Sequence, residues 1–120
     1  MSERLRRERL AYGAGAETLC TLALRLQGYR ILARRFRAPV GEIDIVARRG
    51  ALLSFVEVKA RRDFDRAAEA LGPRQRRRIH RAALQFLKRR PDLAGCAIRF
   101  DVMLVAPWRW PRHVADAWRE

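Results

Sequence analysis

The 120-residue sequence predicts a single α/β domain in which a mixed β-sheet is flanked by α-helices. Two segments, 12–26 and 73–90, carry apolar residues at helical spacing, and the segments between and after them have the composition of strands. A chain of this length buries a core without disulfide bonds. The order of helix, three strands, helix and strand is typical of one layered domain spanning residues 1–120.

The first helix is indicated by an apolar stripe, and Gly28 follows as the residue that ends it. The stripe consists of Tyr12, Ala16, Leu19, Cys20, Ala23 and Leu26. Residues 1–10 form a basic N-terminal segment that lacks the apolar core of a signal peptide. Residues 29–37 form the first strand, which ends before Pro39 and carries scattered basic residues, so we expect it at the sheet edge.

The next two strands, 41–47 and 51–60, are expected to form a β-hairpin. The second of them is almost continuously apolar up to Val58, which is typical of a strand covered on both faces. Glu57 and Lys59 stand near its end, two residues apart, so both side chains leave the same face. Charges at such a position are costly unless they are paired or bind a cation.

The register of this hairpin decides whether Asp44 joins Glu57. A two-residue turn at Arg49-Gly50, or a four-residue loop over 48–51, sets Asp44 opposite Phe55. Asp44 and Glu57 are then diagonal neighbours on one face, with Cβ atoms about 7–8 Å apart. A slip of one residue would move Asp44 to the other face. The sequence therefore predicts a site of two acids and a lysine.

The remaining elements follow from capping residues and apolar spacing. A short helix with an aspartate N-cap is expected at 63–71, a long helix at 73–90, a loop at 91–95 and a strand at 97–105. The buried stripe of the long helix is Ile79, Ala82, Ala83, Phe86 and Leu87. The tail at 106–120 is rich in tryptophan, and its pattern of residues assigns it to neither a helix nor a strand.

A net charge of +14 and a pI near 11.6 indicate nucleic acid as the partner, ahead of an anionic membrane or an acidic protein. Arginines crowd the first half of the long helix without acidic neighbours, which favours a phosphate-binding surface over a merely solvated face. The expected nucleic-acid-binding residues are Arg61, Arg74, Arg76, Arg77, Arg78 and Arg81. DNA is the first expectation, with RNA or branched forms as alternatives.

No apolar run approaches 18 residues, so we expect no membrane span. Cys20 and Cys96 lie among apolar residues at unrelated positions and do not form a disulfide framework. Buried free thiols are expected, in a reducing cytoplasm.

An aspartate followed by Glu-x-Lys on a β-hairpin resembles the metal-dependent nucleases of the PD-(D/E)xK, or restriction-endonuclease-like, class, although the Pro-Asp of that name is absent. Within the class the chain is most similar to the small bacterial YraN-like proteins. The matching stretches are Gly13–Glu17, Gly28–Leu32, Gly41–Ile45, Phe55–Arg61 and Arg99–Val102. They run over most of the chain.

This resemblance implies a restriction-endonuclease-like fold and hydrolysis of phosphodiester bonds with Mg²⁺ or Mn²⁺. Asp44, Glu57 and the carbonyl of Val58 would hold the metal, which prefers oxygen ligands. Lys59 would orient the attacking water and stabilise charge on the phosphate. In a chain that otherwise uses arginine almost throughout, a lysine here suggests a need for a compact ammonium group.

Two further residues match supporting positions of the nuclease class. Glu17, on the first helix, matches an acidic residue near the metal, and its alternative is an ordinary solvated charge. Gln75, in the first turn of the arginine-rich helix, matches a glutamine that touches the site or the DNA backbone. Glu42 shares the strand face of Asp44 and ranks behind it. Asp101 is interpreted as a buried partner of an arginine.

Three alternatives remain at this point. The acids and the lysine could form an ordinary salt-bridge cluster, although buried ion pairs often fail to recover their desolvation cost. The protein could be a catalytically inactive module that only binds nucleic acid, or a basic interaction protein that binds an acidic partner. The domain has few loops that reach base edges, so a homodimer or an accessory protein would supply any sequence specificity.

Overall fold

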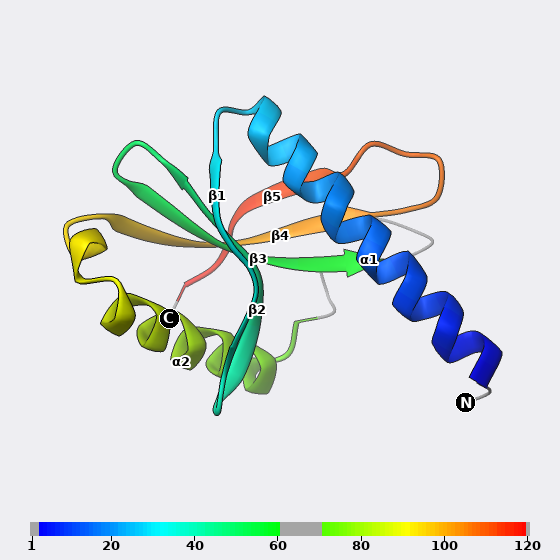
Figure 1. Cartoon of the computed structure of the whole chain (residues 1–120), viewed down its shortest axis with the longest axis horizontal. Coiled ribbons are helices and arrows are strands. Elements are labelled where there is room, and N and C mark those ends of the chain that lie inside the picture. The colour runs from blue at the N-terminus through cyan, green and yellow to red at the C-terminus, as the bar shows by residue number, and fades with distance from the viewer. Residues whose placement is uncertain (1–2, 61–70, 120) are drawn as a thin grey trace.

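A five-stranded mixed sheet lies between two long helices (Figure 1). The computed structural model describes the backbone of residues 3–60 and 71–119 and, within these ranges, the side chains from residue 15 onward. The elements are α1 (Glu3–Leu26), β1 (Arg30–Ala38), β2 (Gly41–Arg49), β3 (Leu52–Ala60), α2 (Pro73–Arg89), the short 3₁₀ helix η3 (Pro91–Leu93), β4 (Ala97–Val105) and β5 (Arg112–Trp118). The strand order is β1-β2-β3-β4-β5, and only β3 and β4 are parallel. The predicted α/β class with a mixed sheet is confirmed.

Helix α1 begins at Glu3, so its backbone includes most of the basic N-terminal segment. Its small buried residues, among them Ala16 and Ala23, let it lie close against the sheet. The predicted stripe is wrong at its end, because Leu26 is 71% exposed in the last turn and Leu24 is buried instead. The side chain of Tyr12 lies outside the described residues. Gly28 ends the helix with a φ of 90°, and the N–H groups of Gly28 and Tyr29 bond back to Arg25 and Leu24. This is the Schellman arrangement for which glycine is suited. Among the described residues, no helix is long and apolar enough to cross a membrane.

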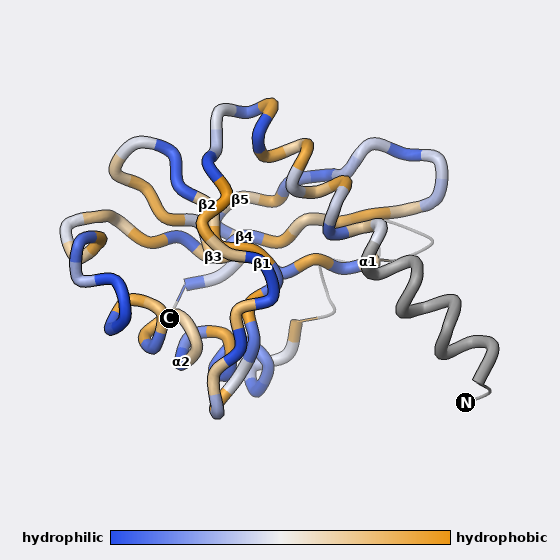
Figure 2. Tube along the Cα trace, in the orientation of Figure 1, coloured by the Kyte–Doolittle hydropathy of each residue, from blue (hydrophilic) through white to orange (hydrophobic). Residues whose placement is uncertain are grey.

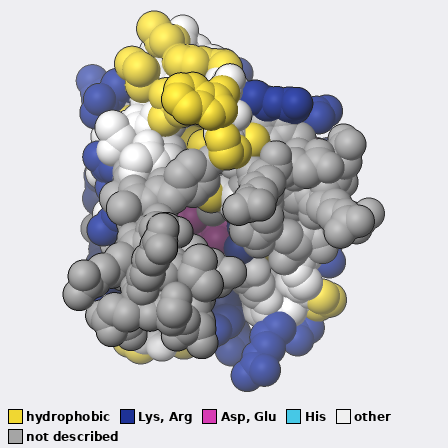
Figure 3. Space-filling model, turned by 90° about the vertical axis from the view of Figure 1, so that its right-hand side faces the viewer, with side chains coloured by type: hydrophobic (Ala, Val, Ile, Leu, Met, Phe, Trp, Pro, Cys, Tyr) yellow, Lys and Arg dark blue, Asp and Glu magenta, His cyan; other side chains and the backbone are white. Residues whose placement is uncertain are grey.

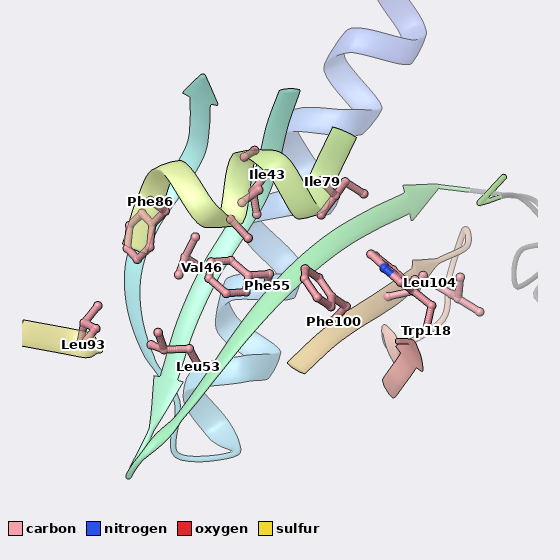
Figure 4. Packing of buried hydrophobic residues seen from close by; sticks show 13 residues of the cluster. Ile43, Val46, Leu53, Phe55, Ile79, Phe86, Leu93, Phe100, Leu104 and Trp118 are labelled. Carbon is pink, nitrogen blue, oxygen red and sulfur yellow. The ribbon is translucent and has the colours of Figure 1, made fainter. Parts of the chain in front are cut away.

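Helix α2 covers one face of the sheet through the stripe that its spacing predicted. Figure 2 shows that the strands carry many apolar residues and that apolar and hydrophilic residues alternate along α2. Beneath the helix, Phe86, Phe55, Phe100 and Trp118 form a row of rings whose neighbouring centroids are 5.2–6.0 Å apart (Figure 4). Aromatic contacts at these distances add to the free energy of burial.

The opposite face of the sheet packs on α1. Ile45, Ala47 and Val56 turn toward this helix, whereas Val46 and Phe55, one residue away in each strand, join the core under α2. This alternation covers both faces of β3, as its almost continuous apolar sequence predicted. Cys20 is fully buried here, but Cys96 is only half-buried because it lies in the turn that leads into β4.

The tail contributes a strand that the sequence left unassigned. Residues 112–118 pair with β4 as the edge strand β5. Its register shifts near Phe100, and Asp116 has a φ of 53°, so apolar and polar residues do not alternate regularly. Trp118 is buried and stacks on Phe100. An interrupted alternation of this kind explains why periodicity did not reveal the strand.

Asp101 anchors a buried polar network beneath α1. It is fully buried, and its carboxylate accepts two hydrogen bonds from Arg99, both at 2.7 Å, and one from the backbone N–H of Asp116. Ser54 donates to it, and His113 Nε2 lies 2.7 Å away. Burial alone would raise the pKa of Asp101, but the hydrogen bonds from His113 and Arg99 outweigh it and hold the pKa well below its usual range.

Replacement of Asp101 by asparagine should lower the free energy of unfolding by about 3 kcal/mol, because the change leaves buried donors without their anion. The unfolded carboxyl titrates near pH 4. Since the folded pKa lies lower, the stabilisation is present above that pH and is lost as the pH falls further. Urea denaturation at pH 7 and pH 3 measures both effects. The control Asp92→Asn removes an exposed partner of Arg90 and should change stability by no more than about 0.5 kcal/mol.

Candidate active site

The hairpin of β2 and β3 brings Asp44 and Glu57 together, but through a register that differs from the predicted one. Arg49 pairs with Leu52, so the turn residues are Gly50 and Ala51 rather than Arg49 and Gly50. Gly50 occupies the first turn position with a φ of 60°. Two-residue hairpin turns require a positive φ at this position, and glycine adopts it without strain.

The shift is two residues, so every side chain keeps its predicted face. Val46 rather than Asp44 stands opposite Phe55, and one more step in this register sets Asp44 across from Glu57. The predicted antiparallel pairing is confirmed, whereas the predicted diagonal relation is wrong. The two acids are closer than expected.

The two carboxyl groups lie close enough for each to influence the pKa of the other. Asp44 Oδ2 accepts the backbone N–H of Val58 at 2.8 Å, so the end of β3 bonds to a side chain of β2. Glu57 is almost completely buried. The hairpin therefore holds both acids at one point with little conformational freedom.

Lys59 and Gln75 complete the group around Glu57. Lys59 Nζ lies 3.4 Å from Glu57 Oε1, and Gln75 Nε2 donates to the same oxygen at 3.1 Å. Lys59 reaches it from two residues along β3, while Gln75 reaches it from the first turn of α2. The structure thus brings Asp44, Glu57, Lys59 and Gln75, which the sequence singled out, into one place.

The electrostatics of the acid pair are unusual for carboxyl groups. Burial and the neighbouring charge of Asp44 raise the pKa of Glu57 to about 8, and Lys59 only partly offsets them. Burial also raises the pKa of Asp44, although the N–H of Val58 opposes this. The site therefore carries less negative charge at pH 7 than two ordinary carboxylates would. Such shifts are typical of functional sites.

Glu17 lies close to this group, in an ion pair that the sequence did not reveal. Arg35 Nε lies 2.8 Å from Glu17 Oε2, so the alternative of a freely solvated charge on Glu17 is wrong. Glu17 and Asp44 are near enough to raise the pKa of Cys20, which burial above all brings to about 12. Among the described residues, no hydrogen bond joins Glu17 directly to Asp44 or Glu57.

Arg35 is a residue that the sequence pattern did not reveal. The β1–β2 register pairs Arg34 with Ile45 and Phe36 with Ile43, so Arg35 falls across from Asp44. Its φ of 51° is left-handed, a conformation that bulky residues adopt only where the surroundings impose it. The sequence does contain a signal for this residue. If β1 and β2 are paired outward from the turn that joins them, a basic residue of the edge strand falls opposite Asp44.

The acids open into a pocket of about 480 Å³ between the β1–β2 turn and the start of α2. Arg37 and Arg78 line it together with Asp44, Glu57 and Gln75. Basic side chains therefore surround the two acids. On the side toward which β3 points, acidic atoms are visible with basic atoms close by (Figure 3). This charge pattern suits a phosphate group held over a carboxylate site.

Gly41 permits the close approach of α2 to β2 that forms this pocket. A Cβ atom at position 41 would lie 2.4 Å from the carbonyl oxygen of Arg78, a backbone atom that cannot turn away. A glycine at the start of a strand is a recognised sign of close backbone approach. The sequence contains this signal in the Gly41–Ile45 stretch, but it does not say which element comes close.

The arginine-rich surface of α2 is partly as predicted. Arg74, Arg77 and Arg81 are exposed, and Arg78 lines the pocket. Arg76 is half-buried, and its Nε has no hydrogen-bond partner among the described residues. Its assignment to an exposed phosphate-binding surface is therefore weaker than that of Arg74, Arg77 and Arg81. Arg61, and the short helix predicted at 63–71 apart from its last residue, lie outside the described residues.

The donor set of the site suits the cation that the nuclease resemblance implies. The described part of the chain offers the carboxylates of Asp44 and Glu57, with the carbonyl of Val58 between Glu57 and Lys59, and contains no cluster of three or more His, Cys, Asp or Glu side chains. Mg²⁺ prefers oxygen ligands and keeps several waters, so two carboxylates and a carbonyl suffice. Burial above all raises the pKa of both acids, and a bound cation would favour their charged forms.

Comparison with known proteins adds the family. Residues 16–105 match the family model described as "Uncharacterised protein family UPF0102". The chain belongs to this family. It is 61% identical to a UPF0102 protein of Parvibaculum lavamentivorans over 107 residues, which cover 89% of this chain and 80% of the relative. A UPF0102 protein of Sinorhizobium medicae is 48% identical over 116 residues, 97% of this chain and 95% of the relative.

The UPF0102 match confirms the resemblance to YraN-like proteins at the level of the family. The matched range contains the acid pair, the lysine and both supporting residues. These are Glu17, Asp44, Glu57, Lys59 and Gln75. The region of the chain that carries the site is therefore the region that defines its membership.

The acid pair should make the protein less stable as the pH rises. Between about pH 4.5 and 8 the folded state keeps a proton on Glu57 that the unfolded state has lost, so the free energy of unfolding falls with pH in this window. Glu57→Gln removes this titration. The variant should lose less stability from pH 5 to pH 8 than the wild type, by more than about 1 kcal/mol.

Urea denaturation across that pH range, without divalent cations, measures the difference. Glu42→Gln is the matched control, because Glu42 lines the same pocket but is exposed, and it should follow the wild type. Parallel curves for the wild type and Glu57→Gln would contradict a raised pKa at Glu57.

Proposed function

We propose that the protein is a metal-dependent nuclease of the PD-(D/E)xK type that hydrolyses phosphodiester bonds. The observation that carries this proposal is the group of Asp44, Glu57 and Lys59, whose two acids line a pocket together with Arg37 and Arg78. Two neighbouring acids, with an ammonium group 3.4 Å from one of them, form an arrangement suited to phosphate chemistry. A purely structural cluster would more often neutralise its charges in full, as Asp101 does.

Each residue has a chemical task in this proposal. Asp44, Glu57 and the carbonyl of Val58 would hold Mg²⁺ or Mn²⁺, which supplies Lewis-acid chemistry when bound. Lys59 lies where it can hydrogen bond to a water and to a phosphate oxygen, and its compact charge stabilises the pentavalent centre. Gln75 keeps the Glu57 carboxyl oriented. Glu17, neutralised by Arg35, would act on the site through water.

The substrate is a polyanion, because basic side chains surround the site. Arg37 and Arg78 line the pocket, and Arg74, Arg77 and Arg81 continue the positive surface along α2. A net charge of +14 supports the same conclusion. DNA is the first candidate, and RNA and branched forms belong to the same chemical class.

Cleavage should require Mg²⁺ or Mn²⁺ and should fall by about 10²–10³ in Asp44→Asn, Glu57→Gln and Lys59→Met. The first two changes remove ligand charge, whereas the third leaves both acids and removes the ammonium group. Lys59→Arg keeps the charge but changes its shape and hydration, so it should also be impaired. Rates are measured on linear, nicked, flapped and branched DNA and on RNA, with each metal.

The control for these variants is Glu42→Gln, which removes an exposed acid of the same pocket and should retain activity. Binding without metal should survive in the two carboxylate variants, since they lose only negative charge. If the wild type cleaves none of these substrates while it still binds them, the protein is a nucleic-acid-binding module with an inactive site.

Binding of duplex DNA should weaken steeply with salt, because each phosphate contact releases counterions and contributes about −0.9 to the slope of log K against log salt. Arg74→Ala, Arg77→Ala and Arg81→Ala combined should reduce that slope by about 3, if all three meet phosphates. Fluorescence anisotropy at salt concentrations from about 50 to 200 mM measures it.

A second triple variant separates local contacts from net charge. Arg25, Arg30 and Arg119 are exposed arginines outside α2, and their replacement by alanine changes the net charge equally. This control should leave the slope close to that of the wild type. Equal effects of the two triple variants would show that α2 has no special role.

A further inference from the structure

The loop between β4 and β5 presents two tryptophans to solvent. Trp108 is fully exposed and Trp110 is more than half exposed, whereas Trp118, the remaining tryptophan of the sequence, is buried. The φ of Trp108 is 62°, a left-handed conformation that is rare for a bulky residue. The N–H of Arg109 bonds back to the carbonyl of Ala106, which closes a turn behind the ring.

Exposed aromatic surface of this size is uncommon without a partner. Burial of a tryptophan in the core would gain free energy, yet this loop holds Trp108 away from it. Between the loop and α1 lies a depression of about 430 Å³, lined by Ala16, Leu19 and Trp110 among others. Its volume lies within the range of ligand pockets. The loop and the helix together form a shallow site with an aromatic wall.

This site lies at the same end of the sheet as the candidate active site. Lys59 pairs with Leu104 in the parallel β3–β4 ladder, and the loop begins directly after Val105. On α1, Ala16 lines the depression, and the next residue, Glu17, belongs to the surroundings of Asp44. Figure 3 shows an apolar patch above the acidic atoms on one face of the molecule.

We infer that Trp108 and Trp110 form a stacking platform for unpaired bases, so that the preferred substrates contain single-stranded nucleic acid beside the bond to be cut. This inference rests on the proposed function. Stacking on tryptophan is available to a base only when it has left the duplex, since paired bases present their edges. Every base has a π-face, so such a platform requires no sequence specificity.

The charge of the surroundings selects nucleic acid as the occupant. Arg109 stands between the two tryptophans, Arg112 is exposed where β5 begins, and the whole chain carries a net charge of +14. Aromatic rings interleaved with basic residues are the surface that binds single strands, because rings hold the bases and cations track the phosphates. An apolar protein partner would gain nothing from this charge.

The test measures binding without metal in an Asp44→Asn background, so that cleavage plays no part. The probes are a single-stranded oligothymidylate, an abasic oligonucleotide of equal length and a duplex of the same length. Trp108→Ala should weaken binding of the oligothymidylate by about 5- to 160-fold, the range for one lost base stack. It should change binding of the abasic and duplex probes by less than about twofold.

Aromatic rescue provides the matched control. Trp108→Phe should restore most of the affinity, whereas Trp108→Leu, which is apolar without a π-face, should not. The oligothymidylate should quench tryptophan fluorescence in the wild type and less in Trp108→Ala, in which Trp110 and buried Trp118 supply the residual signal. Equal restoration by leucine would overturn the inference, as would equal losses on all three probes.

Further measurements on Trp108→Ala distinguish two other occupants of the patch. If the change abolishes self-association in sedimentation velocity, or binding to vesicles containing anionic phosphatidylglycerol, and leaves the oligothymidylate affinity unchanged, the patch is a subunit or membrane contact. The inference then fails.

Cleavage assays without the Asp44→Asn change distinguish the platform from the nuclease proposal. If base stacking depends on Trp108 but the wild type cleaves nothing, the platform stands and the nuclease proposal fails. Cleavage that is indifferent to Trp108 on single strands and duplexes would uphold the nuclease proposal and overturn the platform.

Discussion

The hydrogen bond from the backbone N–H of Val58 to the Asp44 carboxylate is the contact on which the candidate site depends. It ties a side chain of β2 to the backbone of β3 just beyond the last paired residues of the two strands, Ile45 and Val56. With Asp44 fixed, the register sets Glu57 across from it. Glu57 in turn forms an ion pair with Lys59 and accepts a hydrogen bond from Gln75. Because Gln75 belongs to α2, this bond also links the hairpin to the position of a helix that is distant in sequence.

Two buried acid sites in one sheet show how surroundings set the behaviour of a carboxyl group. Asp101 receives hydrogen bonds from Arg99, His113 and other donors, so its pKa lies below the usual range and its charge is satisfied. Glu57 faces another acid and has only Lys59 and Gln75 to offset it, so its pKa rises. The first arrangement stabilises the fold. The second lowers the stability of the fold, which is typical of residues that are retained for a function. The restriction-endonuclease-like interpretation gives a reason for that cost.

Much of the candidate site was predictable because strand periodicity is so regular. Side chains alternate with a period of two, so Asp44, Glu57 and Lys59 stayed on one face although the predicted register was wrong by two residues. The turn was misplaced because the glycine was put in the second turn position instead of the first, where its φ of 60° is needed. Strand β5 escaped prediction, since its shift in register and the left-handed Asp116 interrupt the alternation that marks a strand. Arg35 escaped because its place opposite Asp44 depends on how β1 pairs with β2.

The sequence by itself determined the class of the fold, the two helices, the buried stripe of α2, the end of α1 at Gly28 and the strongly basic charge. These are properties of near neighbours along the chain, where helical and strand periods and local capping dominate. The predicted pairing of buried Asp101 with an arginine is confirmed by Arg99. Only the tertiary structure decided the register of the hairpin, the Glu17–Arg35 ion pair, the further contacts of Asp101 with Ser54 and His113, and the exposure of Trp108. Each of these joins residues from different elements, or depends on what a loop fails to contact, and the free energies involved arise only when the sheet and both helices have packed.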